Sequence, residues 1–512
     1  MTDDTPGGSP DGSPDGSGRR PKVVIVGGGF AGFQTARSLA KRMGDEVDIV
    51  LVSPTNYFLY LPLLPEVAAG ILEPRRISVA LAAALPSCVR HAPGEVDELD
   101  LDGHTIGWLD PEGIHHETSW DRLVIAAGSV HKVLPVPGIT EYAQGFRGVP
   151  EALYLRDHLI RQVELAAVCE DPEEREARLT VVVVGGGYTG TEATAQGFLF
   201  TKELAKSRGL AEVPRWVLVS RGEVLSGLDA HLGRNAERVL RERGVDVRTG
   251  EQVDEATGDG VRLSSSGEHI PTRTLLWCVG VRPDPLIDDL GVEVDQGRIV
   301  ADTHLRVPGH PHVFACGDAA AVPDQARPGE YTAMTAQHAE RQGKLAGRNV
   351  AASLGHGRAK AYKHRDLGFV VDLGGFDAAA NPLGVKLTGV PAHVVARGYH
   401  LMAMPGNRVR TAVDWLMDAL LPRQTAQLGL VRSPAVPLDS ASPEVPQHGL
   451  GFPHRQAPGQ AGPSSDAVFP PRPGGSAEAA SPEASSEAAS AETSSEAATA
   501  SGGGGSPGSG AR

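Results

Sequence analysis

The sequence predicts an α/β protein with two parallel sheets, because one strand–turn–helix pattern occurs twice. Residues 22–32 read KVVIVGGGFAG, where β-branched residues lead into glycines at positions 27, 29 and 32. Residues 179–190 read LTVVVVGGGYTG and repeat both the strand and the glycine spacing. Such runs are typical of a buried parallel strand that feeds a helix. We therefore expect two Rossmann-like domains, the second inserted in the first.

Both glycine turns have the spacing that a dinucleotide requires. One glycine permits a sharp turn, one lets a pyrophosphate approach the backbone, and one lets the helix pack closely on the strand. The phosphates then bind the free N–H groups at the start of the helix. A single turn of this kind is weak evidence of function, but two of them predict two ligands. A flavin beside a nicotinamide is the simplest pair.

The composition excludes several other classes of protein. A chain of 512 residues has room for two or three domains, and its net charge of −15 argues against nucleic-acid binding. Four scattered cysteines form no metal-ligand cluster and fit a reducing compartment. No apolar run reaches the roughly 18 residues that cross a bilayer, and the N-terminus has no secretory signal. We expect a protein inside the cell, with peripheral membrane contact at most.

Composition shifts and the repeated pattern give the expected domain order. Residues 1–20 and 433–512 are rich in Gly, Ser, Pro, Ala and Glu, which predicts disordered tails. Between them we expect the first part of a FAD domain (22–150), a NAD(P)H domain (151–290), the second part of the FAD domain (291–355) and a small C-terminal α+β unit (356–432).

The residues after the second strand of each domain bear on nucleotide preference. The strand at 47–52 ends at Ser53, and the strand at 216–219 ends at Ser220-Arg221. An acidic residue usually binds the ribose hydroxyls here, whereas a neutral residue beside an arginine suits a 2′-phosphate. Arg221 could equally be a solvated surface charge. The choice between NADH and NADPH therefore stays open.

Three further strands end on small residues, where backbone can approach a cofactor. Residues 121–129 reach Ala127-Gly128 after a predicted β-meander over 94–119, and residues 274–283 pass through Gly280. Residues 313–318 deliver Gly317-Asp318, whose carboxylate could hold the ribityl hydroxyls of a flavin. Alone, Gly-Asp is an ordinary turn, and its place after two glycine turns favours the flavin interpretation.

The remaining segments include two apolar stretches that each allow two interpretations. Residues 56–70 (NYFLYLPLLPEVAAG) predict either a core-packing helix or one wall of an apolar ligand site near the flavin. Residues 333–350 form a predicted helix, in which His338 is expected to be a surface or packing residue. Residues 363–407 are expected to form strands and loops. A helix at 408–421 places Val409, Val413, Leu416 and Leu420 on one face, which either packs on the core or docks on a membrane.

Over roughly residues 22–432 the chain resembles the type II NADH dehydrogenases, the single-subunit NADH:quinone oxidoreductases. Asn56–Ala69 matches an aromatic segment followed by P-L-L, and Gly185–Glu192 matches G-G-G-x-T-G-x-E. Ala336–Gln342 (AQHAERQ) matches A-Q-x-A-x-x-Q, the signature of the quinone side. The chain departs from the family at Ser53 and Ser220, where acids are usual.

The resemblance implies that a non-covalently bound FAD takes a hydride from NADH or NADPH and reduces a quinone, expected to be a menaquinone. It implies a peripheral protein on the cytoplasmic face of the membrane that pumps no protons, is compatible with a homodimer and needs no metal. The catalytic residues implied are Glu192 and Gln337, although Glu192 could merely complement a helix dipole.

The resemblance assigns the binding residues to three groups. The residues expected at FAD are Gly27, Gly29, Phe30, Ala31, Gly32, Ser53, Ala127, Gly128, Gly317, Asp318 and Gln337. Those expected at NAD(P)H are Gly185, Gly187, Tyr188, Thr189, Gly190, Glu192, Ser220, Arg221 and Gly280. Gln337 and Gln342 are expected at the quinone.

Three other functions are compatible with the same predicted fold. One is a soluble reductase of a small redox protein such as ferredoxin or rubredoxin, which would need a basic docking patch. Another is a flavin-binding redox sensor that works through its tail. The third is a sulfide:quinone oxidoreductase, which needs cysteines near the flavin; Cys278 and Cys316 end strands there. A disulfide reductase is disfavoured, since Cys88 has no partner cysteine in the first part of the FAD domain (22–150).

Overall fold

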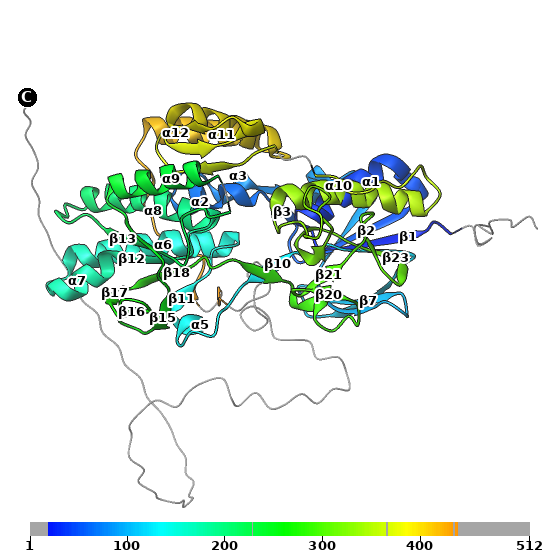
Figure 1. Ribbon diagram of the computed structural model, residues 1–512, viewed down its shortest axis with the longest axis horizontal. Helices are drawn as coiled ribbons and strands as arrows, with labels where there is room; N and C mark the ends of the chain where they lie inside the picture. The colour runs from blue at the N-terminus through cyan, green and yellow to red at the C-terminus, as the bar shows by residue number, and fades with distance from the viewer. Residues whose placement is uncertain (1–18, 228, 365–366, 434–435, 439–512) are drawn as a thin grey trace, which may run out of the picture. The chain divides into compact units, whose positions relative to one another are not determined.

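The structure is a computed structural model that describes residues 19–227, 229–364, 367–433 and 436–438 (Figure 1). The predicted tails lie mostly outside these residues. Where the second tail was expected to begin, the structure differs. Val436 and Leu438 are buried, and Leu438 belongs to the apolar core of the second domain. The folded part of the chain therefore extends beyond the predicted boundary at 433.

The first domain is built on a six-stranded sheet in the order β22-β23-β9-β1-β2-β5. The central strand β1 pairs in parallel with β2 and β9, and its residues from Val23 to Val26 are buried, as the β-branched run predicts. The strands are β1 (Lys22–Val26), β2 (Asp48–Ser53), β5 (Val89–Pro93), β9 (Arg122–Ile125), β22 (Arg306–Val307) and β23 (His310–Ala315).

Two helices from distant parts of the sequence pack side by side in the first domain, α1 (Phe30–Met43) and α10 (Ala336–Ser353) (Figure 1). Their backbones approach closely because α10 carries glycines at the contact. A Cβ on Gly343 would lie 2.1 Å from the carbonyl oxygen of Ala31. This approach brings the N-terminus of α10 to the same cavity as the first glycine turn.

The second domain has an all-parallel sheet in the order β11-β18-β12-β13-β14. Its strands are β11 (Ala143–Gln144), β12 (Thr180–Val184), β13 (Arg215–Ser220), β14 (Asp246–Thr249) and β18 (Thr274–Trp277). Its helices are α5 (Ile139–Tyr142), α6 (Val149–Val168), α7 (Pro172–Leu179), α8 (Tyr188–Ser207) and α9 (Ala230–Arg243). A separate antiparallel sheet is formed by β15 (Val253–Ala256), β16 (Gly260–Leu263) and β17 (His269–Pro271).

The chain passes between the two domains twice, and the two passages pair. Strand β10 (Ser129–His131) runs antiparallel to β19 (Val281–Pro283). Because α5 and β11 already belong to the second domain, that domain begins before the predicted boundary at 151. The elements that precede the long helix α6 are only two to four residues long, and such short elements show no periodicity in the sequence.

Smaller elements complete the first domain. The predicted meander is present as β6 (Glu95–Asp100), β7 (Thr105–Leu109) and β8 (His115–Ser119). Another small sheet contains β20 (Val294–Asp295), β21 (Arg298–Val300) and β24 (Ala320–Ala321). Segment 57–84 forms β3 (Tyr57–Leu59), β4 (Ser78–Ala80), α2 (Leu64–Ala68), α3 (Pro74–Ile77) and α4 (Leu81–Ala84).

The C-terminal unit contains a helix that the sequence did not predict. Strands β25 (Val370–Asp372), β26 (Ala378–Ala380) and β27 (Leu387–Thr388) are followed by α11 (Gly389–Ala403) and α12 (Arg408–Leu420). The expectation of strands and loops through 407 is therefore wrong for α11. Its buried face consists of Ala392, Ala396 and His400, two of which are too small to mark a helical period.

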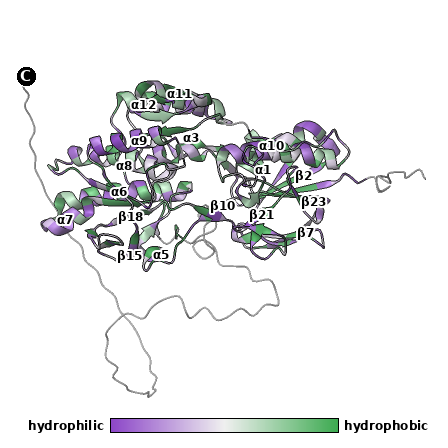
Figure 2. Ribbon diagram, in the orientation of Figure 1, coloured by the Kyte–Doolittle hydropathy of each residue, from purple (hydrophilic) through white to green (hydrophobic). Residues whose placement is uncertain are grey.

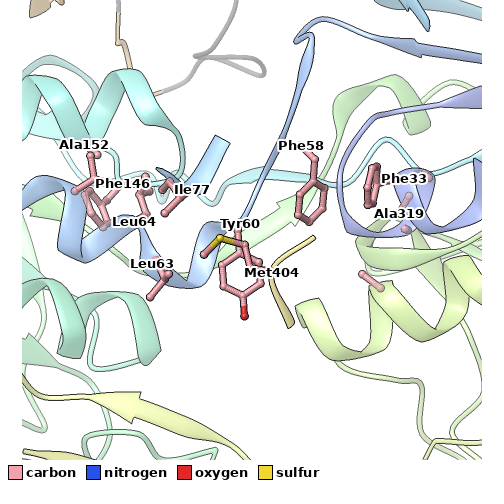
Figure 3. Close-up of a cluster of buried hydrophobic side chains, with 14 of the residues drawn as sticks. Phe33, Phe58, Tyr60, Leu63, Leu64, Ile77, Phe146, Ala152, Ala319 and Met404 are labelled. Atoms are coloured by element: carbon pink, nitrogen blue, oxygen red, sulfur yellow. The ribbon is translucent and has the colours of Figure 1, made fainter. Parts of the chain in front are cut away.

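The apolar segment at 56–70 serves both of the purposes that its sequence allowed. Figure 3 shows Tyr60 between Phe58 and Phe33 on one side and Leu64, Ile77 and Phe146 on the other. Helix α2 packs on α6 and α8 of the second domain. Other side chains of this segment, including Leu59, Leu61 and Pro62, line a cavity. The segment is therefore a part of the core and one wall of the site.

Candidate active site

One cavity of about 1,100 Å³ joins most of the segments that the sequence singled out. It is lined by both glycine turns, by the strand endings at 126–129 and 316–318, and by the N-terminus of α10. The apolar segment at 57–65 and Val395, Tyr399 and His400 of α11 form another part of its wall. The cavity is therefore built by both dinucleotide domains and the C-terminal unit together.

The first glycine turn fits the pyrophosphate of FAD. A Cβ on Gly32 would lie 1.9 Å from the carbonyl oxygen of Gly27, so the helix and strand meet as the spacing predicts. Gly29 has open space where its Cβ would be, so its glycine identity is not required by the protein's own packing. Gly29 is also the N-cap of α1, which has no side-chain cap and no acidic residue in its first turn. The helix start is left free for an anion. Phe30 and Ala31 also line the cavity.

The other predicted FAD residues lie around this turn. Ser53, Ala127, Gly128 and Gly317 all line the cavity. Asp318 accepts a hydrogen bond of 2.8 Å from the hydroxyl of Ser129, and burial raises the pKa of its carboxyl. A carboxyl in this position can accept hydrogen bonds from ribityl hydroxyls, which would replace the water it has lost.

Ser53 and Ser220 occupy equivalent places under the two turns. The hydroxyl of Ser53 lies 2.6 Å from where a Cβ of Gly28 would be, and Ser220 has the same relation to Gly186. Ser220 and Arg221 do not line the cavity; they lie at the C-terminal end of β13, beside the second turn. That is the position where an adenosine ribose is expected.

The second glycine turn repeats the geometry of the first. A Cβ on Gly190 would lie 1.9 Å from the carbonyl oxygen of Gly185, and Gly187 has open space at its Cβ position. Gly187 is the N-cap of α8, again without a side-chain cap. Tyr188 and Thr189 line the cavity, as does Gly280 from the facing strand ending. These groups fit a nicotinamide dinucleotide.

Glu192 lies on the cavity wall, and the pKa of its carboxyl is raised. It is not in the first turn of α8, so complementing the helix dipole does not explain it. Its carboxyl accepts a hydrogen bond of 2.9 Å from the backbone N–H of Asp372. Burial raises the pKa of Glu192 well above its usual range, and the nearby carboxyls of Asp372 and Glu66 add to the shift. The site therefore favours a protonated Glu192.

The two glutamines of the A-Q-x-A-x-x-Q segment lie in different environments. Gln337 lines the cavity; its amide nitrogen donates to the carbonyl oxygen of Gly368 at 2.6 Å, while its buried Oε1 has no hydrogen-bond partner among the described residues. Gln342 is fully buried and does not line the cavity. Both of its polar groups are bonded inside the protein, to Gly317 and Thr332. The structure therefore does not bring Gln342 to the quinone side.

Several residues that line the cavity were missed by the sequence analysis. His338 is one, where a surface or packing role was expected; its ring stacks on His364 with centroids 4.0 Å apart, and its Nδ1 is 2.8 Å from the hydroxyl of Tyr362. Its place beside Gln337, at the start of α10, was a usable signal. Tyr399 and His400 of α11 also line the cavity, and no motif in the sequence points to them.

The two cysteines at the cavity are not poised for thiol chemistry. Cys278 and Cys316 both line the cavity and both are free thiols. Burial raises the pKa of each thiol to about 12, so neither is a thiolate near neutral pH. Thiolate is the reactive form of cysteine. This chemistry does not favour the sulfide:quinone oxidoreductase alternative.

Two dinucleotide-binding domains with a shared cavity define a pyridine-nucleotide-dependent flavoprotein. Residues 21–343 match the family model described as pyridine nucleotide-disulphide oxidoreductase. The type II NADH:quinone oxidoreductase Ndh of Mycobacterium tuberculosis is 29% identical, over 79% of this chain and 89% of the relative. NdhA of the same organism, with the same description, is 34% identical over 60% of this chain and 67% of the relative. The chain belongs to the pyridine nucleotide-disulphide oxidoreductase family and, within it, to the type II NADH dehydrogenases.

A solved structure agrees with the fold. NDH2 from Plasmodium falciparum, in complex with NADH, superposes with a TM-score of 0.73 over 80% of this chain and 100% of that one. The two sequences are 18% identical, so this likeness concerns the fold.

Proposed function

We propose that this chain oxidises NAD(P)H and passes the electrons through bound FAD to a membrane quinone. Menaquinone is the quinone we expect. The observation that carries the proposal is the composition of the cavity wall. Two helix N-termini without side-chain caps suit two dinucleotides. The apolar segment at 57–65 and the cavity side of α11 form a third, apolar binding surface. A quinone head is a ligand of that third kind.

The chain's own residues would bind and orient the reactants. When bound, the flavin supplies the two-electron chemistry between nicotinamide and quinone. Gly29 and the first N–H groups of α1 would hold its pyrophosphate, and Asp318 its ribityl hydroxyls. Gly187, Tyr188 and Thr189 would hold NAD(P)H on the facing side. The free Oε1 of Gln337 could accept a hydrogen bond from the flavin or the reduced quinone.

Reduction of a quinone to a quinol consumes two protons as well as two electrons. Glu192 is placed to hold one of them, because its carboxyl is on the cavity wall and favours the protonated form. The two carboxyls that raise its pKa are buried, and both pair with Arg397, Asp372 at 3.6 Å and Glu66 at 2.5 Å. On this arrangement we propose that Glu192 is the group that stores a proton for quinone reduction.

We propose that the quinone reaches the cavity from a lipid surface that α11 and α12 contact. Helix α12 turns polar groups toward the protein, where Asp414 pairs with Arg76 at 2.8 Å and Trp415 donates to Glu66 at 2.5 Å. Its apolar residues face outward: the exposed fraction is 77% for Val409 and 67% for Leu420. An outward apolar face argues against the core-packing interpretation.

The neighbouring helix extends this surface. Helix α11 lies beside α12, and both ribbons carry hydrophobic residues (Figures 1 and 2). Helix α11 exposes Val390, Val394 and Met402. Among the described residues, none of the helices is long and apolar enough to span a bilayer. We therefore propose peripheral docking, on the cytoplasmic face where NAD(P)H is available. In a homodimer, two copies of α12 would double the apolar area that docks.

The experiment that tests the proposal is a steady-state assay of the flavin-loaded protein with NADH and NADPH. The electron acceptors are a menaquinone analogue, a ubiquinone analogue and a ferredoxin. We expect turnover with a quinone and little with ferredoxin, because the outward face of α11 and α12 is apolar rather than basic. Faster reduction of ferredoxin than of any quinone would favour the soluble reductase instead.

A further inference from the structure

Helix α11 places one polar residue on its buried face, and this residue lies at the cavity. The buried residues of the helix are Ala392, Ala396 and His400. His400 is 7% exposed and belongs to the cavity wall. An imidazole in such a place has two nitrogens that need hydrogen-bond partners.

One of the two nitrogens is bonded to a buried tyrosine. Nδ1 of His400 lies 3.1 Å from the hydroxyl of Tyr60, which is 3% exposed. Burial raises the pKa of Tyr60, so its hydroxyl keeps its proton. Burial and the charge of Arg397 lower the pKa of His400 to about 4, so its ring is neutral at physiological pH.

The partners available to Tyr60 decide which nitrogen of His400 carries the proton. Within the described residues, the hydroxyl of Tyr60 has no acceptor other than Nδ1 of His400. The hydroxyl therefore donates to Nδ1, since the reverse arrangement would leave a buried O–H unpaired. In the neutral ring the proton then lies on Nε2. Within the described part of the chain, the bond through Nδ1 is the one hydrogen bond of this ring, so Nε2 has no partner there.

Residues near Tyr60 and His400 in the sequence give the cavity wall apolar side chains, and the neighbouring arginine of α11 is paired. Leu61, Pro62 and Val395 line the same cavity. Arg397, one turn earlier on α11, is engaged by Glu66 and Asp372. Tyr399 is neutral because burial raises its pKa. A neutral N–H donor with apolar neighbours suits a neutral acceptor on a flat apolar ring, such as a quinone carbonyl oxygen.

We propose that His400 binds the quinone by donating a hydrogen bond from Nε2 to one of its carbonyl oxygens, and that Tyr60 is a positioning residue that keeps the proton on Nε2. This inference rests on the proposed function, since it names residues that would bind the quinone. It assigns a specific contact to a helix that also carries the proposed docking surface. The quinone head would therefore be held directly beneath the lipid-facing side of α11.

The test uses the flavin-loaded full chain with NADH and a soluble menaquinone analogue, menadione. In His400→Ala we expect the KM for menadione to rise about five- to tenfold, the range for loss of one neutral hydrogen bond. The anaerobic rate of flavin reduction by NADH should stay within twofold of wild type. His400→Gln places an amide N–H near the original Nε2 and should recover most of the affinity.

Tyr60→Phe tests the positioning role without removing the aromatic ring. Its KM for menadione should rise two- to fourfold, because Nδ1 then competes for the proton. His393→Ala is the matched control, since this histidine is on the same helix but does not line the cavity. Its KM should equal that of the wild type.

Each other outcome has a distinct meaning. A folded, yellow His400→Ala protein with unchanged KM for menadione would overturn the inference. A rise in KM for NADH instead would also overturn it, by placing His400 at the nicotinamide. An unchanged Tyr60→Phe protein would remove the positioning role. If the wild type reduces no quinone at all, the proposed function itself has failed.

Discussion

The side-chain oxygen of Gln342 accepts a hydrogen bond of 2.8 Å from the backbone N–H of Gly317. The amide nitrogen of Gln342 donates to the hydroxyl of Thr332 at 3.0 Å, so a single buried side chain joins two loops. Gly317 directly precedes Asp318, the carboxyl that we expect at the ribityl chain. Gln342 therefore supports the flavin site from behind.

Replacing Gln342 by Leu should weaken FAD binding. The change leaves the Gly317 N–H and the Thr332 hydroxyl unpaired in a dry interior, which costs about 1–3 kcal/mol for each group. We expect at least a tenfold rise in the Kd for FAD, measured by fluorescence after removal of the flavin. Lys344→Met, at an exposed position of the same helix, is the control. Equal FAD affinity in both variants would contradict the role.

Glu192 should give quinone reduction a pH dependence. Its pKa is raised, so the protonated fraction falls as pH rises through that value. If turnover uses this proton, kcat should decline on the alkaline side in wild type. Glu192→Gln cannot titrate, and its profile should lack that decline. Identical alkaline limbs in the two proteins would exclude Glu192 as the titrating group.

Gln337 should matter to the oxidative half of the reaction. Gln337 lines the cavity, and Gln337→Leu removes its buried, unpaired Oε1 while keeping a similar volume. We expect retained FAD, a raised KM for quinone and a kcat lowered several-fold. Steady-state kinetics with menadione measure both. If KM and kcat stay at wild-type values in the flavin-loaded variant, Gln337 does not face the quinone.

The outward face of α12 should determine lipid binding. The triple variant Val409→Ser, Leu416→Ser, Leu420→Ser removes apolar groups that are exposed, so the fold should be unchanged. Co-flotation with phospholipid vesicles should drop at least fivefold. Val168→Ser with Val213→Ser, two exposed valines of the second domain, is the matched control. A triple variant that floats as wild type does would place the membrane contact elsewhere.

A buried histidine should make the second domain sensitive to acid. Nε2 of His158 lies 2.9 Å from the hydroxyl of Thr274 and 3.0 Å from the carbonyl oxygen of Arg273. Burial lowers the pKa of His158 to about 4, from about 6.5 in the unfolded chain. Between these values the unfolded state binds more protons, so the free energy of unfolding should fall as pH falls. Urea denaturation at pH 7 and pH 5 measures this difference, which His158→Gln should reduce.

Local patterns predicted much of the fold and site. The two strand–glycine–helix units are visible in the sequence because their geometry depends on adjacent residues. Gly27, Gly32, Gly185 and Gly190 make the contacts that the spacing requires. The amphipathic helix at 408–421 was also visible, but not which of its faces meets the protein. That depends on Glu66 and Arg76, which are far away in sequence.

What the sequence could not reveal depends on contacts between distant segments. Gln337 and Gln342 share a motif, and only the packing of α10 on α1 decides that one faces the cavity and the other the interior. Helix α11 was not predicted, because the buried residues of its inner face are two alanines and a histidine, which do not form an apolar helical pattern. The proposed role of His400 depends on its hydrogen bond with Tyr60, which lies 340 positions earlier in the chain.

The most direct measurement is an anaerobic titration of the yellow protein, followed by absorbance at the flavin band. NADH or NADPH should bleach the band at one equivalent, and a menaquinone analogue added afterwards should restore it. A protein that binds no FAD, or a bound flavin that neither nucleotide can bleach, would contradict the account.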